Sequence, residues 1–436
     1  MTDEEQIESQ RQELEQEVPP TPTGADYAPS VAARLELAQR AGGIVIPIVT
    51  TIFAFLMAMI VVAATGHNPF TAFKGIFNGT GLNWSFPWVL GDARDEAAFN
   101  LQQTLILTAT LILTGLAVSF AFKCGLFNIG GNGQYIVGAL MATWVGSSWA
   151  GMASGLHIFL AITLAALAGA LWAGIAGFLK ATVGAHEVIT TIMLNLIASY
   201  VAQALVGREG QLQNTIDTSV PVSSDVVEGA RLPVFWGDPV LQGLHVGFFV
   251  AIAMPVVFWL ILNRTTLGYE VRATGFNPDA ARYGGVNVRR SYFMAMAISG
   301  SFAGLAGAID ILGWQFRLGV LDIQNVTVGF IGIAVALLGR NSAVGVALAA
   351  LLFGALTQGT STRNPAIADI FDPRLAGNLS TIIQALVLLF VGTDLLFLYL
   401  WQLRKKTGGW RTALPFPPSP LRGSTKLPAP PSETRP

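Results

Sequence analysis

The sequence predicts an all-α, polytopic membrane protein, and its composition and uncharged runs carry that prediction. Of its 436 residues, 52% are hydrophobic and only 12% are charged, whereas soluble domains carry about a quarter charged residues. Residues 44–64 and 246–262 contain no charge at all. A helix needs about 20 such residues to cross a hydrocarbon core about 30 Å thick. Runs of this kind recur along the chain and predict about ten transmembrane helices.

Two of the outer loops between the predicted spans are long, at 66–100 and 207–242. In the first loop, Phe70, Phe73 and Phe77 share one face of a short helix, which suits a helix lying at the membrane interface. The second loop is polar and suits either an external cap or a docking surface for a partner. The ten predicted spans are 43–65, 101–122, 126–149, 156–180, 186–206, 243–263, 291–313, 323–340, 343–360 and 379–401.

The distribution of basic residues predicts the orientation of these spans. With ten spans both termini share one side, and that side holds 18 Lys and Arg residues against 7 on the other. Cytoplasmic loops carry the excess of Lys and Arg in membrane proteins. Both termini are therefore expected in the cytoplasm, with the protein in the cell membrane.

The two ends of the chain differ in composition from its middle. Seven acidic residues within 1–17 predict a disordered cytoplasmic tail over 1–40. Eight prolines within 402–436 predict a Pro-rich cytoplasmic tail over 404–436. The transmembrane domain is expected over 41–403.

The stretch LFNIGGNGQ, at the start of the third predicted span, places polar groups at membrane depth. Amide side chains in lipid leave unpaired polar groups that cost several kcal/mol each, to an order of magnitude. The glycines weaken the helix and permit a bend. Two interpretations remain open: a broken or re-entrant segment beside a translocation path, or a plain cytoplasmic turn. The candidate path residues in this stretch are Asn128, Asn132 and Gln134.

The cytoplasmic loop 264–290 contains a short, well-capped helix. Asn277 is a good N-cap, Pro278 suits the first helical position, and Asp279 complements the positive end of the helix. Gly284 and Gly285 are expected to end it after about two turns. So short a helix is not stable alone in water. It either packs on its own bundle or docks into a groove on another subunit.

Small residues predict where the spans pack together. Small residues at every fourth position let helix backbones approach closely in lipid. Two such series are present: Ala165, Gly169, Ala173 and Gly177, and Gly300, Gly304 and then Gly307.

An acidic residue falls within the seventh predicted span. Asp310 lies near its outer end with Trp314 just beyond. Intramembrane carboxylates are costly and usually functional, so both residues are candidates for the solute path. The cost falls near the interface, where an isolated Trp also serves as an anchor.

Several function classes lack support in the sequence. Four histidines are scattered and one cysteine stands alone, so we expect no metal site. The P-loop pattern is absent, so the chain supplies no nucleotide site of its own. A net charge of −1 argues against nucleic acid as a partner. No nucleophile and base occur in a recognisable setting, so we expect no enzymatic activity and no bound cofactor.

Four long motifs resemble a known family. LFNIGGNGQYIVGA, GAHEVITTIMLNLIASY, RATGFNPDAARYGGVNVRRSYFMAMAISGSFAGLAGAIDILG and GFIGIAVALLGRNSAVGVALAALLFGAL occur in this order. They resemble the permease subunits of bacterial ABC importers in the simple-sugar and nucleoside group, especially the nucleoside branch. The resemblance covers about residues 44 to 395.

The resemblance implies a transport subunit with several partners. These are a second permease (as in a heterodimer), a cytoplasmic ATPase that binds ATP and Mg²⁺, a substrate-binding lipoprotein outside the membrane, and membrane lipid. It also implies that the capped helix couples the permease to the ATPase. The implied coupling residues are Arg272, Asn277, Asp279, Ala281, Arg282 and Tyr283.

Two positions depart from the family pattern. Relatives usually carry an acidic residue where Asn132 stands, and often Asp where Ile331 stands. Their absence argues against ion coupling at these positions. The alternatives are a permease for ribose-like sugars or branched-chain amino acids and, in another class, a secondary transporter driven by an ion gradient.

Overall fold

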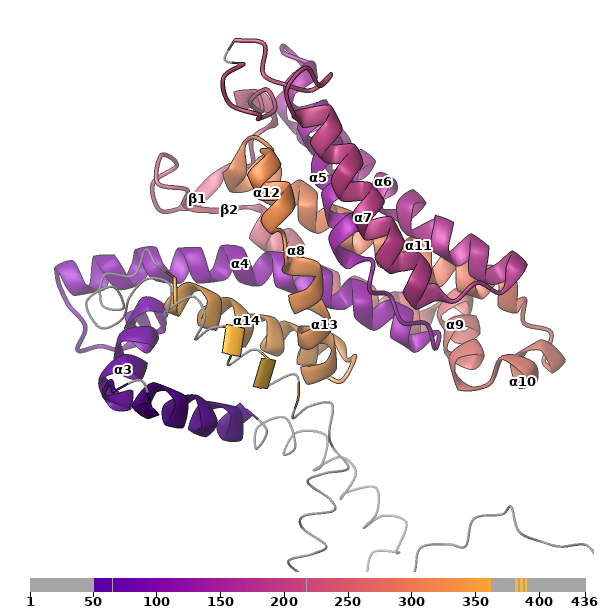
Figure 1. Ribbon diagram of the computed structural model, residues 1–436, viewed down its shortest axis with the longest axis horizontal. Helices are drawn as coiled ribbons and strands as arrows, with labels where there is room; N and C mark the ends of the chain where they lie inside the picture. The colour runs from indigo at the N-terminus through magenta and orange to yellow at the C-terminus, as the bar shows by residue number, and fades with distance from the viewer. Residues whose placement is uncertain are drawn as a thin grey trace, which may run out of the picture. The chain divides into compact units, whose positions relative to one another are not determined.

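The computed structural model describes residues 51–64, 66–216 and 218–361, together with residues 381, 382, 385, 386 and 389. These residues are mostly helical (Figure 1). After a first helix, Thr51–Ala64, the longer helices are α3 (Pro69–Gly79), α4 (Asp92–Lys123), α5 (Gly131–Ser148), α6 (Ser154–Val183), α7 (Glu187–Val206), α8 (Gly247–Arg264), α9 (Thr266–Phe276), α11 (Val288–Asp310), α13 (Val328–Leu338) and α14 (Ala343–Gly359). The short elements are η1 (Leu82–Ser85), η2 (Glu228–Ala230), α10 (Pro278–Tyr283), η3 (Ile311–Gln315), α12 (Val320–Asn325) and the strands β1 (Val234–Trp236) and β2 (Leu244–His245).

Helices that could span a membrane are the main feature of the described residues. Six helices there are long and apolar enough to cross a membrane: Asp92–Lys123, Ser154–Val183, Glu187–Val206, Gly247–Arg264, Val288–Gln315 and Val320–Leu338. Two shorter apolar helices are Thr51–Ala64 and Ala343–Gly359. The predicted span 379–401 falls almost wholly outside the described residues, and so does the start of the first. The count of ten therefore stays a prediction.

Helices α4 and α11 form the centre of the described bundle. In the most apolar 18-residue stretch of each, 83% of the residues are buried, against 22% in the corresponding stretches of α7 and α8. Helix α11 packs on α4, α5 and α6, while α13 and α14 pack on α4. Figure 1 shows α13 and α14 on the same side of α4. The outward faces of α6, α7 and α8 are apolar, as lipid requires.

The small-residue series join α6 to α11, as predicted. A Cβ atom added to Gly300 would overlap the carbonyl oxygen of Gly169, and one added to Gly304 would overlap that of Ala165. Gly307 instead meets the backbone of Tyr135 in α5. The close approach of these three helices fixes the interior in which the polar residues lie.

Local signals set the helix ends. The side chain of Ser342 accepts a hydrogen bond from Gly345 N at the start of α14 (3.2 Å), and that of Asn277 caps α10. Gly184 ends α6 in the left-handed conformation at φ 70°, which favours glycine. The short helix predicted in the first long loop is present as α3, and its N-cap Asn68 accepts a hydrogen bond from Phe70 N (2.9 Å).

Two interruptions divide the bundle. Helix α4 ends at Lys123 and α5 begins only at Gly131. The predicted span 126–149 therefore begins as non-helical backbone. The second interruption follows α11, where a π-helical turn, the short helix α12 and Val326 and Thr327 precede α13. The single predicted span 323–340 is thus divided between α12 and α13. The break was not predicted because its signal in the sequence is weak.

Candidate functional site

Non-helical backbone at the first interruption lies deep inside the bundle. Asn128 is fully buried, and its Nδ2 donates to Ser299 Oγ of α11 (2.7 Å). Ser299 lies eleven residues into α11, which is about 16 Å along the axis at about 1.5 Å per residue. Irregular backbone survives at such depth only where protein or a water-filled cavity surrounds it. The segment enters the bundle and does not turn at its surface.

The amides of this segment satisfy one another. Asn128 Nδ2 donates to Gln134 Oε1, and Gln134 Nε2 donates back to Asn128 Oδ1, both at 3.0 Å. Gly130 N donates to the same Oδ1 (2.8 Å). Ser299 Oγ in turn donates to Ala117 O (2.5 Å). Asn128 and Gln134 therefore brace the junction of α4, α5 and α11.

Asn132 connects the two interruptions. Its Nδ2 donates to Val326 O (3.0 Å) and its Oδ1 accepts from Gly329 N (2.6 Å). Gly131 and Gly329 are in close backbone contact, which a side chain on either would disturb. An amide suits this position because it donates and accepts at once, whereas a carboxylate only accepts.

Asp310 is the centre of a buried polar cluster in the described bundle. Its Oδ1 accepts from Thr110 Oγ1 (2.5 Å) and from Trp314 Nε1 (3.2 Å), and its Oδ2 accepts from Tyr135 OH (2.7 Å). Asp310 is 3% exposed. Three neutral donors surround the carboxylate, and no salt bridge to it is found within the described residues. Such a group accepts hydrogen bonds from a donor-rich solute such as a polyol or an amino-bearing base.

The space beside this cluster is closed. A cavity of about 20 Å³ lies between α5, the π-helical turn and α12. That volume holds about one water molecule and excludes a larger solute. Its lining is formed by Tyr135, Ile136, Ala139, Gln315, Leu318, Asp322, Ile323 and Val326.

The long loop after α7 covers this region as a cap. Its backbone follows the second interruption, with Val226 N donating to Phe316 O (2.7 Å), Ser223 N to Leu318 O (2.9 Å) and Val320 N to Pro221 O (3.1 Å). The Arg231 guanidinium lies 4.6 Å from the centre of the Phe316 ring. The loop also holds the strand pair β1–β2, which the sequence analysis missed. The cap interpretation of this loop is supported by these bonds.

The capped loop helix is present as α10, with the predicted boundaries. Asn277 Oδ1 accepts from Asp279 N (2.9 Å) and Ala280 N (3.0 Å), and Gly285 has φ 83° just after the helix. Ala281 is the buried residue of α10, so the helix packs on its own bundle through the face that carries Ala281. Figure 1 shows α9 and α10 projecting beside each other from the bundle.

The other face of α10 is open. Tyr283 is 96% exposed and Phe276, just before the helix, is 91% exposed. The Arg282 side chain is 70% exposed and lies 3.7 Å from Asp279, an arrangement that contributes little stability. The sequence analysis missed Phe276, although an aromatic residue in a loop predicted to be cytoplasmic is itself a signal for a contact surface.

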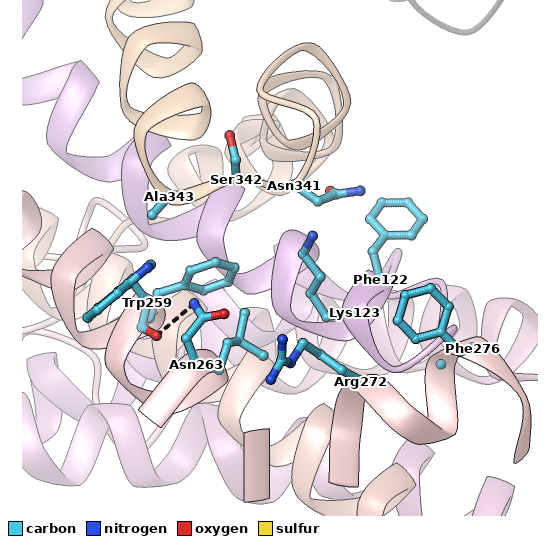
Figure 2. Close-up of a pocket in the computed structure, with 12 residues that line it drawn as sticks. Phe122, Lys123, Trp259, Asn263, Arg272, Phe276, Asn341, Ser342 and Ala343 are labelled. Carbon is cyan, nitrogen blue, oxygen red and sulfur yellow. Dashed lines mark hydrogen bonds between the residues drawn. The ribbon is translucent and has the colours of Figure 1, made fainter. Parts of the chain in front are cut away.

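Arg272 lies apart from this surface. It lines a pocket of about 530 Å³ between the ends of α4, α8, α9 and the turn before α14. Figure 2 shows Arg272 and Lys123 pointing into the same pocket. Two cations there create a positive potential, because none of the described lining residues is acidic. The remaining lining residues are Phe122, Phe258, Trp259, Leu262, Asn263, Gly275, Phe276, Asn341, Ser342 and Ala343.

Several transport proteins are similar to this chain over most of its length. The guanosine ABC transporter permease NupP of Bacillus subtilis is 34% identical over 85% of this chain and 99% of its own length. The nucleoside ABC transporter permease NupB of Lactococcus lactis is 33% identical over 72% of this chain and 83% of its own. The glucose ABC transporter permease TsgB13 of Haloferax volcanii is 34% identical over 80% of this chain and 87% of its own. No solved structure matches the chain significantly.

The family of these relatives fits the described architecture. All three relatives are permease proteins of ABC transporters, which are transport subunits with ATP hydrolysis on separate subunits. The model of the family described as the branched-chain amino acid transport system permease component matches residues 100–392. Those residues run from α4 past α14 and include both interruptions and the helix α10. The chain is therefore a multi-pass membrane protein that belongs to this permease family of ABC transporters.

Proposed function

We propose that this chain is the permease subunit of an ATP-driven importer for nucleosides. The single observation that carries the proposal is the 34% identity, over 85% of the chain, to a permease described as transporting guanosine. The chemistry of the interior agrees with it. Asp310, Tyr135 and Gln315 present acceptors and donors that suit ribose hydroxyls and base amino groups, and Trp314 offers an aromatic face for a base.

The proposed path uses Asp310 and Trp314 directly and Asn128, Asn132 and Gln134 indirectly. Tyr135 lines the small cavity and donates to Asp310, which also accepts from Trp314. The three amides hold the interruptions in place by the bonds described above. Movement of α12 and α13 would widen the cavity while those amides keep α5 fixed.

The partners follow from the importer class. A second permease completes the path, a cytoplasmic ATPase with ATP and Mg²⁺ drives it, and a binding lipoprotein delivers the solute outside the membrane. We propose that Arg282 and Tyr283 contact the ATPase, while Asn277 and Asp279 keep α10 folded and Ala281 seats it. Arg272, which belongs to α9, would help to hold that helix in place through the adjoining pocket that it lines. Both termini then lie in the cytoplasm of a bacterial cell.

The test is uptake of radiolabelled solutes by cells with and without this gene, the other importer subunits being intact. We expect deletion to abolish guanosine uptake at submicromolar concentration and to leave glucose and leucine uptake unchanged. A control strain keeps this gene but carries an ATPase partner that cannot hydrolyse ATP, and it should lose the same uptake. Loss of leucine uptake instead would contradict the proposal.

Glucose is a second candidate, favoured by the 34% identity to the glucose permease of Haloferax volcanii. The same assay separates the two. If deletion removes glucose uptake and spares guanosine uptake, the sugar assignment replaces the nucleoside one. If the ATPase-deficient control retains full uptake, the transporter is instead driven by an ion gradient.

A further inference from the structure

We propose that the solute path runs along one edge of α7, lined by Asn195, Ser199 and Gln203 together with Gln324 of α12. We also propose that this uncharged polar line passes a neutral, hydroxyl-rich solute and disfavours an ionised one. The inference rests on the proposed function, because it states how the same permease conducts a nucleoside.

The three α7 residues recur at every fourth position along a candidate membrane span. Each is half-buried, at the edge where the buried face of the helix ends. The line extends about 12 Å from Asn195 to Gln203 at about 1.5 Å per residue. The rest of the exposed face of α7 is apolar apart from the Tyr200 hydroxyl, and it suits lipid. That apolar face holds Ile189, Ile192, Met193, Leu196, Ile197, Tyr200 and Val201.

Hydrogen bonds join the line into one surface. Gln203 Nε2 donates to Ser199 Oγ (3.0 Å), and Gln324 Nε2 donates to Gln203 Oε1 (2.9 Å). Asn195 accepts from Gly133 N (2.8 Å) and donates to Ile129 O (2.9 Å) at the first interruption. A primary amide has two N–H donors and two acceptor lone pairs. These bonds therefore leave capacity on each amide for water or solute.

Helix α12 continues the polar surface on the other side. Gln324 and Asn325 are exposed, and Thr327 follows them in the second interruption. All three lie within the candidate span Val320–Leu338. Exposed amides and hydroxyls at membrane depth require water or protein beside them. The surface therefore faces a wet path or a second permease, and its bonds to both interruptions favour the path.

The charges near the line sit at its ends. Toward the start of α7, the Glu187 carboxylate pairs with Lys180 at 2.8 Å, so the two charges compensate each other. At the other end, Asp322 on α12 accepts from Gly319 N (2.9 Å) and adds negative charge. A neutral lining does not compensate an ion for lost hydration, and Asp322 repels anions. A nucleoside satisfies these conditions and a nucleotide does not.

The test uses cysteine variants in the complete importer during ATP turnover. We expect Ser199→Cys and Gln203→Cys to react with a charged, membrane-impermeant methanethiosulfonate at least about tenfold faster than lipid-facing controls, because the thiolate forms only where water reaches it. The controls are Ile197→Cys and Val201→Cys, which are 49% and 44% exposed on the apolar face. The labelling does not require saturating guanosine. It is read by mass spectrometry of the permease.

Three outcomes decide the proposal. Fast labelling at positions 199 and 203 that also blocks transport supports it. Labelling as slow as in the lipid-facing controls overturns it, and so does fast labelling without any loss of transport. Guanosine uptake by the unmodified importer reports separately on the proposed function, so the two failures are distinguishable.

A charge variant tests the neutrality of the line. Gln203→Glu keeps the side-chain length and adds a charge, and we expect at least about a tenfold loss of uptake rate with unchanged assembly. Gln211→Glu, at an exposed position of the outer loop, is the matched control and should transport normally. A Gln203→Glu importer as active as the control would overturn the proposed selectivity.

Discussion

At the residue scale, the buried carboxylate of Asp310 joins three helices and the π-helical turn. Thr110 comes from α4, Tyr135 from α5 and Trp314 from the turn itself. Hydrogen bonds to a charged group contribute about 1.5–3 kcal/mol each. The carboxylate therefore orders the interior, in addition to the proposed role of offering acceptors to a solute.

Replacing Asp310 tests both roles. Asn at this position offers one acceptor oxygen, and its NH2 group faces a donor. We expect Asp310→Asn to lower the free energy of unfolding by about 1–3 kcal/mol and to reduce transport strongly. Thr110→Val removes one donor only and should show the smaller effect on both. The measurements are the melting temperature in detergent and uptake; an unchanged Asp310→Asn protein would refute the assignment.

The lone cysteine provides a second residue-scale prediction. Burial raises the pKa of the Cys124 thiol to about 12, so the thiolate needed for alkylation is scarce at pH 8. We expect no reaction with a maleimide at pH 8 in the folded protein, and full reaction in SDS at the same pH. Rapid labelling of the native protein would show that Cys124 is accessible.

At the element scale, the contact between α6 and α11 depends on missing side chains. Gly300 and Gly304 place the backbone of α11 against Gly169 of α6. Van der Waals packing of this kind is a main source of helix association in lipid.

Adding one methyl group tests this contact. Gly300→Ala places a Cβ against the carbonyl oxygen of Gly169 and the Cβ of Ala173, and overpacking of this kind costs about 1–3 kcal/mol. Gly155→Ala, where no heavy atom lies within 4 Å, is the matched control on α6. We expect a lower melting temperature for the first variant only, and equal values for both would contradict the packing.

Sequence patterns predicted these elements well where one physical rule dominates. Hydrophobic length located α6 and α7 to within a few residues, and capping rules located α10. The second interruption was missed because only Val326 and Thr327 separate α12 from α13, and neither Gly nor Pro marks the break. The polar edge of α7 was missed because Ser199 and Gln203 lie far apart in sequence from Gln324, and only the fold brings them together.

The candidate site was predicted in part for the same reason. Asn128, Asn132 and Gln134 were identified because amides in an apolar run are conspicuous. Their bonding to one another and to α13 could not be predicted, because register between distant segments depends on the packing of the whole bundle.

At the scale of the whole molecule, the exposed face of α10 lies at one end of a helix bundle whose polar cluster is held by α4, α5 and α11. Helix α10 packs on α9 and α11, so under the proposed function a force applied at α10 would reach α11 through the short turn between them. Coupling of this kind requires the complete importer.

Reversing one charge tests the coupling. We expect Arg282→Glu to reduce guanosine uptake at least about tenfold in the assembled importer, because reversing a charge at the proposed contact with the ATPase costs affinity. The permease itself should fold normally. Arg289→Glu, at an exposed position of α11, is the matched control. Uptake and ATP hydrolysis should be measured together, and unchanged uptake for Arg282→Glu would remove it from the contact.

The bonds of Asn132 have a consequence for the transport cycle. One amide holds both ends of the Val326–Gly329 corner, so these two bonds break in one event when α13 moves. Breaking paired bonds requires a threshold force. Small thermal displacements of the corner are reversed, and only a force above that threshold carries the corner to its next position. In the proposed importer, such a threshold would suppress solute leakage between cycles through a single side chain far from the ATPase.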